Sequence, residues 1–134
     1  MKNKLFRWLG VNNRRSTPPL ATTSTDHPTI LEVTDTTFAE QVLQPRQLVV
    51  VDFWAEWCQP CQIMSAYVTF LAKDFGEQLV LAALDVDENP IIPAQYDIMG
   101  LPTLLLFYQG VVVDRIVGIE PYETIRERVA QQLF

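Results

Sequence analysis

The chain has 134 residues, about half of them apolar, and a net charge of −6. This length and composition predict one compact domain rather than two domains or a globally disordered chain. The charge is unevenly spread, because residues 1–29 carry a balance of +4 and residues 30–134 a balance of −10. An acidic body repels phosphate backbones, so we expect no nucleic acid as a partner.

Residues 1–29 form a basic N-terminal extension rich in Pro and Thr. We expect it to be disordered, because residues 12–29 have the composition of a linker and no apolar periodicity with which to form a core. Within residues 1–11, Leu5, Trp8 and Leu9 fall on one side of a short helical pattern among basic residues, which predicts weak contact with an anionic membrane surface or a partner groove. A frayed basic terminus and a targeting peptide are the alternatives.

The apolar runs and the cysteine count both bear on the compartment. No run reaches the ~18–20 apolar residues that a membrane-spanning helix needs, so we expect a soluble protein. The chain has only two cysteines, Cys58 and Cys61, which is too few for the disulfide framework of a small secreted domain and favours a reducing, cytoplasmic location. Organelle targeting through the extension stays an alternative.

From residue 30 onward, strand-like and helix-like patterns alternate. We expect strands over residues 30–33, 47–55, 79–86, 103–108 and 111–117, and helices over residues 35–44, 58–75, 90–99 and from Pro121 onward. Asp35 is the expected N-cap of the first helix. Residues 47–55 form an almost continuous apolar run, which indicates a central strand buried on both faces. Gln109 and Gly110 predict a tight turn between the last two strands. The order predicts an α/β domain over residues 30–134, with a central mixed β-sheet flanked by helices.

The spacing of Cys58 and Cys61 suggests redox chemistry. The pair lies where a buried strand gives way to a helix, and the positive end of the helix dipole should lower the pKa of Cys58 and make it the nucleophile. Cys61 lies one turn further along, close enough to attack a mixed disulfide on Cys58. A structural zinc site would need two more ligands, so we expect no bound metal.

Two further acidic features stand out. Asp52 interrupts the apolar run of residues 47–55, and a carboxylate buried in a strand is costly unless it has a purpose. Asp85, Asp87 and Glu88 form an acidic cluster without the ligand spacing or glycine of a calcium loop. We therefore interpret the cluster as a solvated strand end.

The motif D-F-W-A-E-W-C-Q-P-C at residues 52–61, with G-L-P-T at 100–103 and L-F-Y-Q-G at 106–110, resembles the thioredoxin family. The resemblance spans residues 30–134 and implies the thioredoxin fold. It also implies a dithiol–disulfide oxidoreductase that reduces target-protein disulfides without a bound cofactor, using the Cys58–Cys61 redox-active disulfide. Electrons would come from a thioredoxin reductase, and we expect a monomer.

The resemblance also implies roles for individual residues. Asp52 corresponds to the family's buried carboxylate, which assists proton transfer from Cys61, and Pro102 corresponds to the family's cis-proline. Matching residues form a flat apolar target-binding surface: Trp57, Leu101, Val117 and Gly118. Gln59 and Pro60, between the cysteines, tune the redox potential.

The sequence departs from the family pattern at several positions near the cysteines. Gln59 replaces a glycine, Gln62 a basic residue, Ala66 the proline that kinks the active-site helix, and Ala83 a lysine near the buried carboxylate. These departures leave two alternatives to a general reductant. One is an interaction module whose turnover is incidental, and the other is a disulfide oxidant or isomerase with a higher reduction potential.

Overall fold

A five-stranded mixed sheet forms the centre of the structure, a computed structural model that describes residues 29–133. Predictions for residues 1–28 lie outside the described residues. The strands, in chain order, are β1 (Ile30–Glu32), β2 (Leu48–Trp54), β3 (Leu79–Asp85), β4 (Thr103–Tyr108) and β5 (Val111–Val117). Their order across the sheet is β1-β3-β2-β4-β5. Each strand lies within a segment that the sequence pattern predicted as extended, and the mixed sheet is confirmed.

The central strand β2 is buried along its whole length. It pairs in parallel with β3 and antiparallel with β4. Because β4 runs the opposite way, its first residue, Thr103, pairs with Phe53 near the end of β2. The end of β2 and the start of β4 therefore lie at one edge of the sheet, where the segments that follow β2 and precede β4 meet.

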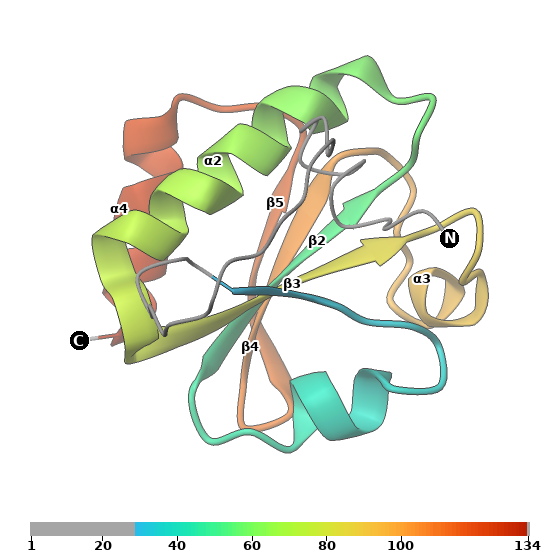
Figure 1. Cartoon of the computed structure of the whole chain (residues 1–134), viewed down its shortest axis with the longest axis horizontal. Coiled ribbons are helices and arrows are strands. Elements are labelled where there is room, and N and C mark those ends of the chain that lie inside the picture. Colours follow the sequence, from blue (N-terminus) through green and yellow to red (C-terminus); the bar gives the residue numbers. More distant parts are fainter. Residues whose placement is uncertain (1–28, 134) are drawn as a thin grey trace, which may run out of the picture.

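Helical segments cover both faces of the sheet (Figure 1). They are the π-helical η1 (Ala39–Leu43), α2 (Gln59–Phe75), the 3₁₀ turn η2 (Gly76–Gln78), α3 (Ile91–Gln95) and α4 (Tyr122–Leu133). Helices α2 and α4 lie together on one face, while η1 and α3 cover the other. Within residues 29–133, no helix is long and apolar enough to cross a membrane.

Strand alternation divides the buried side chains into two clusters. The α2 face contains Val50 and Trp54 of β2 with Cys58 and Cys61. The opposite face contains Val49, Val51 and Phe53 of β2, which pack with residues of η1 and α3. The continuous apolar run that marked β2 in the sequence reflects this burial on both sides.

The β4–β5 hairpin follows the prediction. Gln109 and Gly110 connect the two strands, and both have positive φ angles, 53° and 84°. That backbone geometry matches the right-handed twist of the strands, and glycine adopts it without a Cβ penalty. A register shift between Leu106 and Phe107 then moves the pairing by one residue and brings Val117 opposite Thr103, at the edge of the sheet where β2 ends.

The predicted role of Asp35 is wrong. The first helical segment spans only Ala39–Leu43, and the Asp35 carboxylate accepts hydrogen bonds from the backbone N–H groups of Ile91 and Ile92 at 3.1 and 2.8 Å. Asp35 thus caps α3, which lies far from it in sequence. Threonine hydroxyls bond to the backbone in residues 34–37 and form a local turn where a first helical turn was expected.

The predicted extent of a second helix also needs correction. Helix α3 covers Ile91–Gln95 rather than residues 90–99, because Asp97 takes a left-handed conformation with φ of 55° and ends it. On α2, Met64, Val68 and Leu71 face the core, while the apolar side chains of Ile63 and Phe70 are exposed. The apolar stripe around α2 is therefore wider than the surface that the helix buries.

Candidate active site

The two cysteines form a disulfide at the start of α2. Cys58 is the N-cap residue and Cys61 lies in the first helical turn, with their Cα atoms 5.3 Å apart. The backbone N–H of Cys61 donates to Sγ of Cys58 at 3.2 Å, so sulfur takes the acceptor position that an N-cap oxygen usually fills. The helix terminus thus presents both a hydrogen-bond donor and the positive end of its dipole to the Cys58 sulfur.

Gln59 and Pro60 occupy the first two helical positions, and both are exposed. Proline costs nothing there, because the N–H groups of the first turn have no partner within the helix. Further along, α2 continues through the exposed Ala66 to Phe75 without a break, as expected where the family's proline is absent. The two cysteines differ little in burial, 5% and 3% exposed, so exposure does not distinguish their roles.

Asp52 lies in the middle of β2 and is 0% exposed. Its neighbours in register are Ala83 on β3 and Leu104 on β4, both apolar. By strand alternation it lies on the face that packs against α2 and holds both cysteines. Ala83, where the family has a lysine, is directly beside it and supplies no positive charge.

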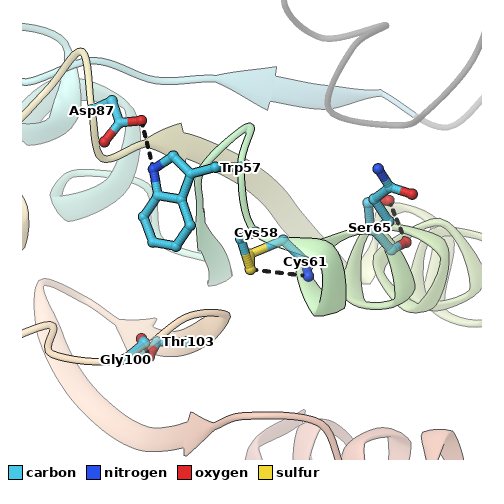
Figure 2. The surroundings of a disulfide bond; sticks show 8 residues. Trp57, Cys58, Cys61, Ser65, Asp87, Gly100 and Thr103 are labelled. Atoms are coloured by element: carbon cyan, nitrogen blue, oxygen red, sulfur yellow. Dashed lines mark hydrogen bonds between the residues drawn. A yellow bond between two sulfur atoms is a disulfide. The ribbon is translucent and has the colours of Figure 1, made fainter.

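The loop before β4 lies across from the disulfide, with Gly100 and Thr103 facing that end of α2 (Figure 2). The Leu101–Pro102 peptide bond is cis. Leu101 packs against the cluster that contains both cysteines, and the N–H of Gly118 donates to the carbonyl of Pro102 at 2.8 Å. Thr103 Oγ1 also donates to the carbonyl of Gly100 at 2.6 Å. Several contacts thus fix the loop against the sheet.

Trp57 is 69% exposed and lies beside the disulfide. Its indole Nε1 donates to Oδ2 of Asp87 at 3.0 Å, which holds the ring over the turn that follows β3 (Figure 2). Asp85 is buried, and its Oδ1 accepts from the N–H of Asp87 at 2.9 Å. The acidic cluster is therefore not simply a solvated strand end, because Asp85 orders the turn and Asp87 orients Trp57.

The comparisons with known proteins agree with this geometry. The family profile described as Thioredoxin matches residues 29–131. The thioredoxin of Griffithsia pacifica is 38% identical over 104 residues, covering 78% of this chain and 95% of its own length. Thioredoxin 1 of Synechococcus elongatus is 39% identical over 101 residues, covering 75% and 94%. The thioredoxin of Staphylococcus aureus is 41% identical over 104 residues, covering 78% and 98%.

The chain belongs to the thioredoxin family. Like the family, it is a thiol–disulfide oxidoreductase, and it reduces protein disulfides through the Cys58–Cys61 pair. The thioredoxin fold predicted from the sequence motifs is confirmed. Among residues 29–133, no group of three or more His, Cys, Asp or Glu side chains is placed to hold a metal ion.

The structure brings together the residues that the thioredoxin resemblance singled out. Leu101 and Pro102 precede β4, while Val117 ends β5 and Gly118 follows it and bonds to Pro102. Val117 is exposed, whereas Trp54 is buried in the core. The sequence interpretation of Asp87 as part of a solvated strand end missed its contact with Trp57, which spans 30 positions and leaves no local pattern.

Met99 was also missed. It is 90% exposed and immediately precedes the Gly100–Pro102 segment of the loop. An isolated methionine between a short helix and a strand gives no periodic signal. Its exposure adds an apolar side chain to the loop that faces the disulfide.

Proposed function

We propose that Cys58 is the attacking thiol in disulfide reduction and that Cys61 is the resolving thiol. The observation that carries this assignment is the N-cap position of Cys58, where the N–H of Cys61 donates to its sulfur. The same donor and the helix dipole favour a thiolate at Cys58 once the disulfide is reduced. Cys61 lies within the helix and receives no equivalent N-cap bond.

The reaction proceeds in two exchanges. The Cys58 thiolate attacks one sulfur of the target disulfide, forming a mixed disulfide and releasing the first target thiolate. Cys61 then transfers its proton to Asp52 and attacks the Cys58 sulfur, which restores the Cys58–Cys61 disulfide and releases the second target thiolate. The target gains two electrons and the chain loses two. The burial of Asp52 on the α2 face supports its place as the proton acceptor.

We assign target binding to the surface around the disulfide. Its residues are Trp57, Leu101, Pro102, Val117 and Gly118. The exposed apolar atoms of Trp57 and Val117 support this assignment, as does the fixed loop through Pro102, whose backbone can pair with an extended target segment. Gln59 and Pro60, exposed beside the sulfur atoms, tune the potential.

The partners follow from the chemistry of a dithiol that needs no bound cofactor. We propose that a thioredoxin reductase restores the dithiol and that disulfide-containing proteins consume it. Residues 30–134 act as a monomeric catalytic domain in electron transport and redox homeostasis of the cytoplasm. Residues 1–29 are an extension whose residues 1–11 make weak contact with anionic membrane surfaces. Sedimentation of the full chain with anionic vesicles tests that contact, and no sedimentation would refute it.

Trapping experiments test the assignment of the two thiols. Cys61→Ser should accumulate mixed disulfides through Cys58, because the attacking thiol remains and the resolving thiol is lost. Cys58→Ser should abolish reduction of insulin driven by dithiothreitol and should trap no target. Equal trapping by both variants would contradict the assignment.

A redox titration separates the reductant from its alternatives. A reductant should have a midpoint potential near the ~−270 mV typical of reducing dithiols, whereas an oxidant or isomerase lies nearer ~−120 to −180 mV. An interaction module would bind targets but reduce insulin only very slowly, even where its potential favours reduction. Either result would overturn the proposed role as a general reductant.

A further inference from the structure

Arg115 of β5 reaches the segment that connects α3 to the active-site loop. Its Nη2 donates to the backbone carbonyl of Tyr96 at 2.6 Å, and its Nη1 to that of Asp97 at 3.3 Å. These carbonyls belong to the two peptide groups that flank the Cα atom of Asp97. The N–H of Gly118 holds the far end of the same loop through the carbonyl of Pro102. Arg115 of β5 and Gly118, just after β5, therefore hold the two ends of the loop.

The backbone at Asp97, between the two carbonyls that Arg115 binds, has an unfavourable conformation. Asp97 has a φ of 55°, a left-handed conformation that residues with a Cβ disfavour and that glycine usually supplies after a helix. The N–H of Asp97 donates to Ala94 at 3.3 Å and that of Ile98 to Pro93 at 2.9 Å, the pattern of a Schellman motif. Such a turn fixes the direction in which the chain leaves α3, and here it does so without glycine.

Arg115 is itself held in place. Arg128 of α4 makes a bidentate ion pair with Asp114 at 2.6 and 3.0 Å and also donates to the carbonyl of Arg115 at 3.1 Å. Oδ1 of Asp114 accepts the N–H of Arg115 at 2.8 Å. Because the backbone at Arg115 is fixed from the α4 side, its planar guanidinium can hold two carbonyls at once.

We propose that Arg115 is a positioning residue for target binding. It holds both peptide groups around Asp97 and so sets the direction of residues 98–102 toward the disulfide, without touching the target. This inference rests on the proposed binding of targets at that loop. A guanidinium suits the task better than an ammonium, because only the planar fork reaches two carbonyls with fixed geometry.

The test compares Arg115→Met, Arg115→Lys and the control Arg126→Met. Arg126 is a similarly exposed arginine that bonds to Asp74 between α2 and α4, away from the loop. Amide hydrogen exchange at Ile98 reports opening of the turn. Two substrates reduced with dithiothreitol as electron donor report function: insulin, which needs a docking surface, and dithiobis(nitrobenzoate), a small disulfide that needs only the thiol.

Arg115→Met should speed exchange at Ile98 and raise the KM for insulin about fivefold, with kcat nearly unchanged, because it removes charge-assisted hydrogen bonds from the loop. Its rate with the small disulfide and its midpoint potential should match the wild type. Arg115→Lys should raise the KM for insulin less than Arg115→Met does. Arg126→Met should change neither the KM nor the exchange at Ile98.

The readouts distinguish failure of this inference from failure of the proposed function. Unchanged exchange at Ile98 in Arg115→Met would overturn the positioning role alone. Faster exchange with an unchanged KM for insulin would overturn the proposed binding of targets at the loop, and the inference with it. An equal loss of rate with both substrates would place the effect at the dithiol and also overturn the inference.

Discussion

The two faces of the sheet use the same strands but bury different chemistry. The face toward α2 and α4 contains both cysteines, Asp52 and, by strand alternation, Asp85, the two buried carboxylates of the strands. The face toward η1 and α3 packs aromatic rings, with Phe38, Tyr96 and Phe107 in mutual contact at centroid distances of 5.3–5.8 Å.

This division has an energetic consequence. The buried Asp52 carboxylate and the helix N-terminus capped by the Cys58 sulfur contribute less to stability than apolar packing at the same places would. The aromatic face contributes burial and ring packing that the chemistry does not interrupt. We therefore expect mutations on one face to change chemistry and mutations on the other to change stability.

The largest expected effect is on the aromatic face. Phe38 is fully buried and contacts both other rings. Phe38→Ala should lower the free energy of unfolding by about 3–5 kcal/mol, through lost burial and the cavity left behind. The rate of insulin reduction per folded molecule should remain that of the wild type. Chemical denaturation and a reduction assay on the same samples measure both.

Phe70→Ala is the matched control for this prediction. The same side chain is removed, but Phe70 is 43% exposed on α2, where its ring packs against Tyr67 and Tyr122 at the surface. It should cost about 1 kcal/mol or less, since little area is lost from the core. A comparable loss in both variants would show that burial on the aromatic face is not the source of the stability.

Asp52→Asn should change chemistry and stability in opposite directions. Replacing a carboxyl group that is 0% exposed with an amide should raise the free energy of unfolding at neutral pH by about 1 kcal/mol, because burial of an ionisable group costs more than burial of an amide. Release of the target from the mixed disulfide should slow, because Cys61 loses its proton acceptor. Denaturation and single-turnover kinetics provide the two measurements.

Asp85→Asn is the control, because Asp85 is the other buried carboxylate and lies at the end of β3 beside Trp54. It should leave the release rate unchanged. If Asp52→Asn released targets as fast as the wild type, Asp52 would have no part in proton transfer.

The contact between Trp57 and Asp87 should have a smaller effect, confined to binding. Asp87→Ala frees the indole N–H and lets an exposed ring move. We expect the KM for insulin to rise about two- to fivefold, the change that a net hydrogen bond of ~0.5–1 kcal/mol produces. Glu88→Ala, the neighbouring exposed acid, should not change it. An unchanged KM in Asp87→Ala would show that targets bind without a fixed tryptophan.

The sequence predicted local features well because local physics determines them. The apolar run of residues 47–55 identified β2, and Gln109 with Gly110 identified the hairpin. Asp35 was misjudged because its carboxylate caps a helix 56 residues away, a choice that no local pattern reveals. Asp87 and Arg115 were missed for the same reason, since each acts on a residue that only the folded chain brings near.

The smallest effect should come from the network that joins α2 to α4. Asp74 accepts hydrogen bonds from the hydroxyl of Tyr122 at 2.6 Å and from Nε of Arg126 at 3.0 Å. The bond from Tyr122 lowers the pKa of Asp74, desolvation opposes this shift, and Arg126 adds to it. Burial, reinforced by Asp74, raises the pKa of Tyr122. The Asp74 side chain is 37% exposed, so solvent screens the network and its contribution is small.

The pKa shifts of Asp74 and Tyr122 limit the stability that this network contributes to a range of pH between them. The lowered pKa of Asp74 gives stability that is present above the ~3.9 of the unfolded chain and is lost as pH falls through the folded value. The raised pKa of Tyr122 gives stability that is complete below ~10 and is lost as pH rises further. Asp74→Asn should therefore differ most from the wild type near neutral pH and converge with it in acid. Tyr122→Phe should flatten the alkaline limb. Denaturation of the three proteins from acid to alkaline pH measures both limbs, and a constant offset across the whole range would show that neither group's titration is coupled to folding.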